Sequence, residues 1–304
     1  MTDQTMHSSA LQRGIVYMLA STFIFSLMNV GIRWASDELH AFQIAFFRNL
    51  FGLVFMLPWL LRHGISVLHT KRGGLYWLRA IFGLISMLAF FWSLTVLPLS
   101  QAVALSFTVP IFVTIGAAVF LGEQVHWRRW LAILAGFIGT VVILRPGTDV
   151  NWVPSLIVIG SSVTMAASVL IIKELSKTEA SNSIVTYMVL MLVPLSLPPA
   201  IAVWQWPSAE TWLIVFLIGS FGTIAHLLFT NALKISDVSV VMPFDFGRLL
   251  FIVFFAWLIF DQKVDYYTLI GAIIVFVSGV YIAHRESKVH QKKVITNKRI
   301  AGPS

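Results

Sequence analysis

The chain of 304 residues contains no cysteine, which excludes disulfides, thiolate nucleophiles and cysteine-based metal sites. Its eight histidines lack the spacing of a zinc-binding helix, and the sequence has no glycine-rich phosphate loop and no nucleophile-elbow serine. The sequence therefore predicts no catalytic residues, no metal site and no cofactor. We expect a protein that is not an enzyme.

Charged residues are also scarce, at 11% of the chain against about 25% in an ordinary soluble domain. Hydrophobic residues make up 58% and recur in runs of roughly 20 residues, the length of a helix that spans a bilayer. The connections between the runs are too short to fold separately. We predict ten transmembrane helices, near residues 13–34, 42–62, 74–96, 99–121, 128–145, 152–173, 183–204, 211–233, 239–260 and 266–284.

These ten runs form two sets of five with matching residues. Arg33 matches Lys173 after a shift of 140 positions, and Leu94 matches Leu233 after a shift of 139. Five crossings leave the chain on the opposite side of the membrane, so the second set enters from the other face. The predicted fold is an all-α integral membrane protein with two inverted five-helix repeats, an arrangement of many secondary transporters.

The repeats are expected at residues 13–147 and 152–285, between a polar N-terminal segment, 1–12, and a basic tail, 286–304. Both termini are predicted to be cytoplasmic, because lysine and arginine then gather on the inner side. The inner segments hold Arg13, Arg62, Lys71, Arg72, Arg128, Arg129, Lys173, Lys177, Lys234 and six further basic residues from Arg285 onward. The outer segments hold Arg145 and Lys263, with Arg33 near an outer boundary.

This asymmetry explains the net charge of +8 without a nucleic-acid partner. The basic tail is expected to fix the topology and to touch anionic lipid headgroups. The predicted location is the cell inner membrane, as a multi-pass protein. Membrane lipids are accordingly the expected partners of the tail.

Charged side chains inside the runs are the main functional candidates. Arg48 lies about a third of the way into its run, where an arginine costs about 2.5–3.5 kcal/mol at mid-membrane, so it needs a partner or a wet cavity. Asp245 and Arg248 lie one turn apart. They either form a self-neutralising pair that fixes helix packing or project into a common substrate pathway. Arg79 either marks the inner end of its helix and snorkels to headgroups, which is the favoured interpretation, or contacts the substrate.

Several uncharged residues are weaker candidates for substrate binding. Trp92, Phe107 and Tyr187 lie deep in their runs and either pack in the core or form an aromatic wall for a flat ligand. Asn29 and Gln101 either bridge helices or bind substrate. A further candidate, His226, is either a structural imidazole or part of a proton-coupling site.

Two prolines interrupt corresponding runs of the two repeats, Pro110 in the first and Pro243 in the second. Such breaks indicate either gating helices or static kinks. Small residues in the runs at 128–145 and 266–284, among them Gly136, Gly139 and Gly271, are compatible with close helix contacts or with a homodimer face.

Several motifs resemble the drug/metabolite transporter superfamily, in its ten-helix branch with two EamA domains. They are the segment from Pro110 to Gly122-Glu123, the helix from Trp130 to Pro146, and the stretch PFDFGRL from Pro243 to Leu249. The stretch from Leu39 to Arg48 is similar to a subgroup that includes S-adenosylmethionine uptake transporters. The resemblance covers about residues 14–285.

The resemblance implies a central cavity lined by helices 1 to 4 and 6 to 9, with helices 5 and 10 as supports. In that cavity Arg48 and Arg248 would attract an anionic group, and Asp245 would sense a cation or a proton. The sequence departs from a symmetric site, because Met188 occupies the position that matches Arg48, and Asp261-Gln262 replaces the expected glutamate at the end of the second repeat.

The predicted function is secondary active transport of a small polar or zwitterionic metabolite, similar to S-adenosylmethionine or an amino acid, by alternating access. Two alternatives stay open. One is a lipid or polyprenyl-phosphate flippase, and the other is a membrane scaffold that transports nothing.

Overall fold

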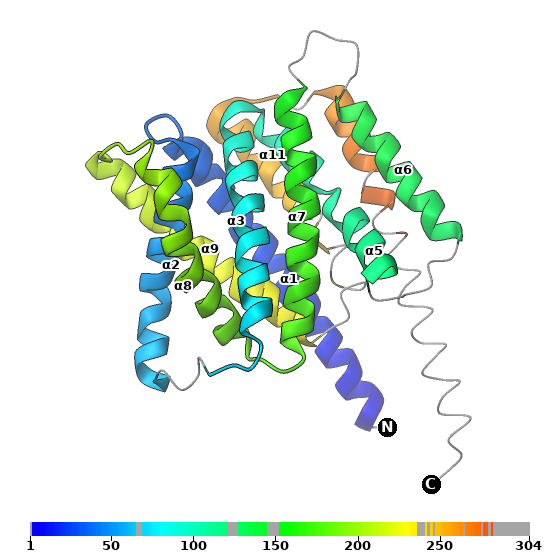
Figure 1. The fold of residues 1–304 in the computed structure, drawn as a ribbon. Coiled ribbons are helices and arrows are strands. Elements are labelled where there is room, and N and C mark those ends of the chain that lie inside the picture. Colours follow the sequence, from blue (N-terminus) through cyan, green and yellow to red (C-terminus); the bar gives the residue numbers. More distant parts are fainter. Residues whose placement is uncertain are drawn as a thin grey trace.

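The computed structural model describes residues 2–64, 69–120, 127–144, 152–235, 241, 244–245, 247–263, 265–274, 276–278 and 281. Every regular element within these ranges is helical (Figure 1). The elements are α1 (Thr2–Ala35), α2 (Ala41–His63), α3 (Gly73–Val96), α4 (Leu99–Ser106), α5 (Val109–Phe120), α6 (Trp127–Leu144), α7 (Val153–Ser176), α8 (Ser181–Ile201), α9 (Ala209–Ile235) and α11 (Gly247–Phe260).

Six of the described helices are long and apolar enough to cross a bilayer, namely α2, α3, α7, α8, α9 and α1 from Gln12 onward. Four shorter apolar helices, Leu99–Val113, Leu134–Ile143, Leu250–Phe260 and Tyr266–Ser278, coincide with the remaining predicted runs. The prediction of an all-α, multi-pass membrane fold is thereby confirmed. α1 begins at Thr2, so the predicted polar segment 1–12 belongs to the same helix as the first run.

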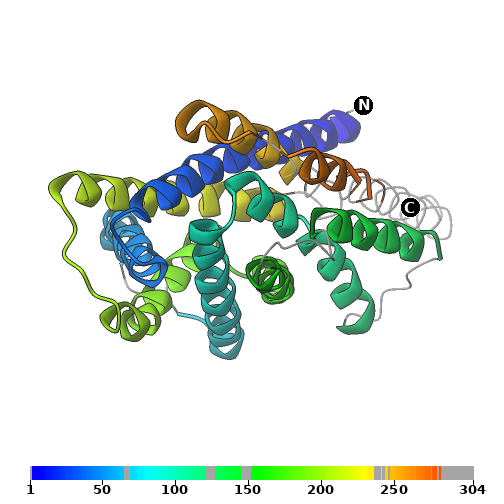
Figure 2. The ribbon, with the colours of Figure 1, turned by 90° about the horizontal axis from the view of Figure 1, so that it is seen from above.

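The helices form two rows when the molecule is viewed from above (Figure 2). α1, α9 and α11 lie in one row, and α3, α7 and α5 lie in the other. α2 and α8 pack against each other at one end of the rows. α6 and the stretch at 266–278 lie at the opposite end.

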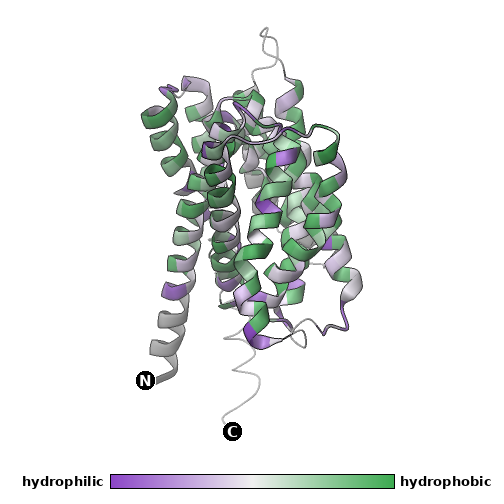
Figure 3. Ribbon diagram, turned by 90° about the vertical axis from the view of Figure 1, so that its left-hand side faces the viewer, coloured by the Kyte–Doolittle hydropathy of each residue, from purple (hydrophilic) through white to green (hydrophobic). Residues whose placement is uncertain are grey.

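The outer surface of the bundle is apolar. Leu61 and Leu250 are each 74% exposed, and Trp257 is 57% exposed. In Figure 3 hydrophobic residues dominate the length of the helices, while hydrophilic residues concentrate near their ends. In water this surface would be unfavourable, whereas lipid chains cover it at no hydrophobic cost.

The fourth predicted run is split into α4 and α5 by a turn at Phe107 and Thr108. Proline lacks an N–H group and its ring clashes with the carbonyl four positions earlier. For Pro110 that position is Ser106, where α4 ends. Pro110 is then the second residue of α5, a position in the first helical turn that proline tolerates.

The corresponding run of the second repeat is also interrupted. The prediction places this run at 239–260 with a break at Pro243, and α11 begins at Gly247, after a short 3₁₀ turn at Phe244 and Asp245. Asp245 therefore lies just before the helix rather than inside it. Pro243 itself lies outside the described residues.

Glycines allow close contact at two helix interfaces. A Cβ atom on Gly219 of α9 would lie 2.5 Å from Phe51 Cβ and 3.1 Å from the backbone nitrogen of Gly52 in α2. A Cβ atom on Gly271 would lie 2.6 Å from the carbonyl oxygen of Gly139 in α6. Gly139 and Gly271, from the face predicted for helix contacts or a homodimer, thus contact each other within one chain. The homodimer stays a prediction.

Two basic residues tie the C-terminal ends of helices together. Arg33 Nη1 on α1 donates hydrogen bonds to the carbonyls of Leu94 (3.0 Å) and Thr95 (2.6 Å) at the end of α3. Lys173 Nζ on α7 donates to the carbonyl of Leu233 (3.1 Å) at the end of α9. A cation is favourable at a helix C-terminus because it meets the negative end of the helix dipole. We call these contacts the Arg33 tether and the Lys173 tether.

Glu38, between α1 and α2, joins the start of α9 on the side of the Arg33 tether. It accepts hydrogen bonds from the Thr211 hydroxyl, the Ser208 hydroxyl (2.9 Å) and the Ser208 backbone N–H (2.6 Å). The Thr211 hydroxyl, and then Ser208, hold the pKa of Glu38 below its usual value because they stabilise the carboxylate. The stabilisation is present at neutral pH and is lost as the pH falls through this lowered pKa.

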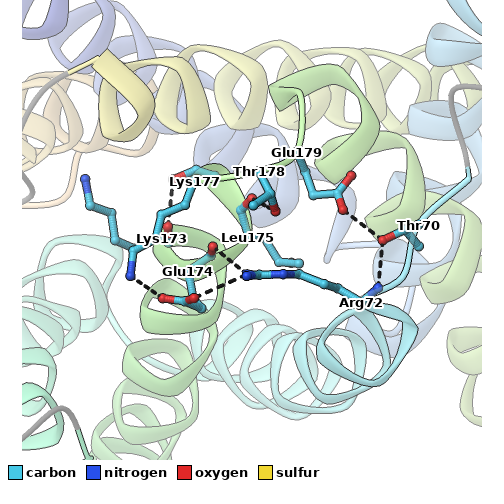
Figure 4. Close-up of polar contacts among 9 residues, drawn as sticks. Thr70, Arg72, Lys173, Glu174, Leu175, Lys177, Thr178 and Glu179 are labelled. Atoms are coloured by element: carbon cyan, nitrogen blue, oxygen red, sulfur yellow. Dashed lines mark hydrogen bonds and ion pairs between the residues drawn. The ribbon is translucent and has the colours of Figure 1, made fainter.

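A second polar cluster lies on the side of the Lys173 tether (Figure 4). Arg72, just before α3, donates from Nη1 to the Glu174 carbonyl (3.1 Å) and to Glu174 Oε1 (3.2 Å) at the end of α7. The Thr70 hydroxyl donates to Glu179 Oε1 (2.8 Å). Each end of the bundle therefore has one cluster of polar contacts that joins neighbouring helices.

The packing of α2 on α9 leads to a first prediction. Gly219→Ala should lower the free energy of unfolding by about 1–3 kcal/mol, because the added Cβ meets backbone atoms that cannot move aside. Gly160→Ala in α7 is the matched control, because its Cβ would meet nothing within 4 Å and should change stability by less than about 1 kcal/mol. Thermal unfolding in detergent compares them, and equal melting temperatures would contradict the close contact.

Candidate functional site

A cavity lies between the two rows of helices, with α2 and α8 at its side. Its described lining comes from α1 to α5, from α7 to α9, and from Asp245 and Arg248 at the start of α11; neither α6 nor the stretch at 266–278 contributes. This is the helix set that the family resemblance implies. The cavity volume of about 130 Å³ accommodates several water molecules.

Arg48 reaches this cavity from α2 and is only 2% exposed. Its Nη1 donates to Asn49 Oδ1 (2.9 Å), and Asn49 Nδ2 donates to Ser196 Oγ (3.2 Å), which holds the acceptor in place. The guanidinium lies against Gly222 of α9, where a Cβ atom would be 2.7 Å from Arg48 Nε. The glycine therefore provides the space for this buried charge.

Arg79 lies in the same cavity, so the interpretation as a snorkelling residue is wrong. It is 4% exposed on α3, and its Nη2 lies 2.9 Å from the sulfur of Met188 on α8. Gly83, one turn further along α3, leaves room for the guanidinium, because a Cβ atom there would be 3.0 Å from Arg79 Nη1. Position near a helix end misled the sequence interpretation, since the side chain runs inward rather than toward headgroups.

Asp245 and Arg248 form an ion pair, and both residues line the cavity, so the packing role and the pathway role stay open for them. Their side chains are 11% and 18% exposed. Asp245 precedes α11, where its negative charge meets the positive end of the helix dipole. The Arg248 guanidinium carbon lies 5.4 Å from the ring centre of Phe25, which adds a cation–π contact.

Two uncharged candidates also line the cavity. Neither polar atom of the Asn29 side chain has a hydrogen-bond partner among the described residues, and the same holds for His226 Nδ1. The His226 ring meets Phe25 edge to face, with 5.0 Å between ring centres. Water or a ligand in the cavity would satisfy these atoms.

The described lining carries three arginines and one carboxylate, which gives a net charge of +2 (3 − 1) with His226 neutral. Asp245 pairs with Arg248, whereas Arg48 and Arg79 have no carboxylate partner in the described part of the chain. An isolated charge in a dry protein interior costs several kcal/mol. Water or an anionic group in the cavity would offset this cost.

The remaining predicted site residues lie elsewhere. Trp92 and Gln101 line a second pocket near the end of α3. Phe107 is buried in the hydrophobic core at the end of α4, and Tyr187 packs on Tyr76 with 4.2 Å between ring centres. Their roles in binding stay predictions, as do the gating roles of Pro110, whose side chain lies outside the description, and Pro243.

The aromatic lining of the cavity differs from the predicted aromatic residues. It consists of Phe25, Phe90, Phe91 and Phe229. The 140-residue shift also pairs cavity positions of the two repeats with each other, namely Ser86 with His226 and Arg48 with Met188.

Comparison with known proteins identifies the family. The model of the EamA-like transporter family matches residues 12–145 and again residues 152–283. The chain belongs to this family. It is similar to an S-adenosylmethionine uptake transporter of Rickettsia felis, with 30% identity over 280 residues, covering 92% of this chain and 95% of the relative.

Other relatives carry different substrates in their names. A riboflavin transporter of Vibrio cholerae is 31% identical over 286 residues, covering 92% of this chain and 96% of the relative. The pseudopaline exporter CntI of Pseudomonas aeruginosa is 24% identical over 276 residues, covering 90% and 96%. A solved crystal structure shares the fold, with a TM-score of 0.65 and 19% identity over 91% of this chain and 97% of that one.

The ion pair of the cavity gives a second prediction. Asp245→Asn and Arg248→Gln should each destabilise the protein, because each leaves a mostly buried charge without its partner. The double variant should be less destabilised than the sum of the two, by about 0.5–3 kcal/mol. Unfolding in detergent measures all four proteins, and additive effects would show that the pair contributes no coupling energy.

Proposed function

We propose that this EamA protein is a secondary active transporter that moves a small polar or zwitterionic metabolite across the bacterial inner membrane by alternating access. The observation that carries the proposal is the cavity between two helix rows, with the buried arginines Arg48 and Arg79 unpaired by carboxylates among the described residues. Buried charges inside a membrane bundle typically belong to a substrate or ion pathway. The transporter names of the relatives support this function over catalysis.

In this proposal Arg48 and Arg248 attract the anionic group of the substrate, and Asn29 adds donors and acceptors beside them. Asp245 responds to a cationic group or a proton, and His226 assists in the coupling. Proton binding at Asp245 would release Arg248 from the ion pair. Binding of the coupling proton would thereby change the net charge of the cavity.

We also propose that the two halves are inverted copies, with both termini on the cytoplasmic side. Two features support the inversion. α1 and α7, which begin the two repeats, run in opposite directions in Figure 1. In addition, α1 packs on α9 and α7 packs on α3, so that exchanging the repeats converts one pair into the other.

The tethers fit a rocking motion between the two rows. The Arg33 tether joins α1 of one row to α3 of the other, and the Lys173 tether joins α7 to α9. They lie at opposite ends of the bundle, since α1 and α3 end at the upper side of Figure 1 while α7 and α9 end at the lower side. Breaking one tether opens the cavity to one face, and the helix breaks before Pro110 and Gly247 provide bending points.

A transport assay tests the function. Uptake of a labelled metabolite into proteoliposomes should be abolished in Arg48→Gln and in Asp245→Asn, because each removes a charge that binds or couples the substrate. Arg62→Gln, at an exposed position in the last turn of α2, is the control with unchanged uptake. Insertion is checked by the amount of folded protein in the vesicles. Unchanged transport kinetics in both cavity variants would refute the assignments.

Cysteine labelling tests the tethers. Because the chain has no cysteine, a single Ser106→Cys substitution on the cavity wall labels one site only. Arg33→Gln should raise labelling by an impermeant thiol reagent about tenfold from one face of the membrane, and Lys173→Gln should do so from the other, since each loses charge-assisted hydrogen bonds. Increased labelling from the same face in both variants would contradict the proposed motion.

A further inference from the structure

The charge of the cavity restricts the substrate further than the proposed function does. Arg48 and Arg79 enter the cavity from the neighbouring helices α2 and α3. Arg48 lies against Gly222 of α9, and Arg79 lies against Gly83 of its own helix. Surface arginines would not need such space. The two positions are therefore built to hold guanidinium groups inside the bundle.

Most donors of these two arginines have no acceptor among the described residues. A guanidinium has five N–H groups. Arg48 donates one hydrogen bond to Asn49, and Arg79 points one nitrogen at the thioether of Met188, a weak acceptor. Arg79 Nε has no partner among the described residues. Carboxylate or phosphate oxygens accept from such donors in pairs, which makes them the fitting ligands.

A cationic substrate finds fewer partners among the described lining residues. Their one carboxylate, Asp245, is paired with Arg248 through Oδ2, and its Oδ1 is left without a hydrogen-bond partner among the described residues. S-adenosylmethionine carries a net positive charge, so it would add a charge to a cavity that already holds +2 (three arginines minus one aspartate). Removal of the methyl group from its sulfonium gives S-adenosylhomocysteine, which lacks that charge and keeps the rest of the molecule.

The uncharged part of the lining favours rings. Phe25, Phe90, Phe91 and Phe229 face the cavity together with several methionines. Phe25 contacts His226 at its edge, and Arg248 lies over its ring. Aromatic and thioether side chains provide favourable contacts for a planar ring system.

We propose that the substrate is a small organic anion with a planar ring, and that Arg79 binds its anionic group together with Arg48. The inference rests on the proposed transport function, because it names the substrate class of the same cavity. Arg79 is then a residue that determines specificity for charge.

Matched pairs of probes test the substrate class in the purified wild-type protein. The pairs are flavin mononucleotide against riboflavin, nicotinate against nicotinamide, and S-adenosylhomocysteine against S-adenosylmethionine. In each pair the more negative member should bind about tenfold to a hundredfold more tightly, as expected for charge-assisted hydrogen bonds. Dissociation constants follow from the rise in melting temperature with ligand concentration. Failure of every anion to stabilise the protein, or preference for the less negative members, overturns the proposal.

Arg79 variants separate charge recognition from a structural role. In Arg79→Gln the preference within each pair should fall to about a third or less of its wild-type value, because the less negative member loses less binding free energy than the more negative one. Arg79→Lys should restore part of the preference, since it keeps the charge and loses the planar fork. If Arg79→Gln weakens both members of a pair equally, the residue acts only through packing and its role is refuted.

Uptake measured with the same probes distinguishes this inference from the proposed function. If the protein prefers the more negative probes but takes up none of them into proteoliposomes, the transport function is refuted and the preference for anions is still supported. Uptake that favours S-adenosylmethionine over S-adenosylhomocysteine supports transport and overturns the anion class. If Arg79→Gln fails to fold, the wild-type preferences and Arg79→Lys decide the question.

Discussion

Buried positive charge governs this structure. Arg48 and Arg79 lie inside a bundle whose outer face is apolar, and guanidinium groups cannot lose their charge as lysines do. Their burial costs free energy that hydrogen bonds, water or a bound anion must offset. The glycines beside them leave space for these guanidinium groups inside the bundle, and the cavity between the helix rows gives them a place for water or a bound anion.

The two repeats share a framework and differ in chemistry. The tethers of Arg33 and Lys173 are matched in both halves, each closing one end of the bundle. In the cavity the match breaks down, because Arg48 corresponds to Met188 and Ser86 to His226. In the proposed transport cycle the matched framework would act at both ends of the bundle. The proposed substrate would meet different side chains from the two repeats.

The aspartate–arginine pair connects the cavity with the broken helix. Asp245 lies in the turn before α11 and Arg248 in its first turn, so the pair forms where the backbone leaves helical geometry. The Arg248 guanidinium and the positive end of the α11 dipole stabilise the carboxylate. A change of charge at this pair would therefore alter both the electrostatic potential of the cavity and the interactions at the break before α11.

The sequence by itself determined the membrane class, the ten apolar segments and the matched halves, because hydrophobic length and repeat spacing are local properties of the chain. It also placed Arg48, Asn29, His226 and the Asp245–Arg248 pair among the candidates. Only the tertiary structure decided that Arg79 turns inward and that Trp92, Gln101, Phe107 and Tyr187 lie outside the cavity. The direction of a side chain depends on which neighbouring helix leaves room for it, and at Arg79 that room is made by Gly83 and Met188.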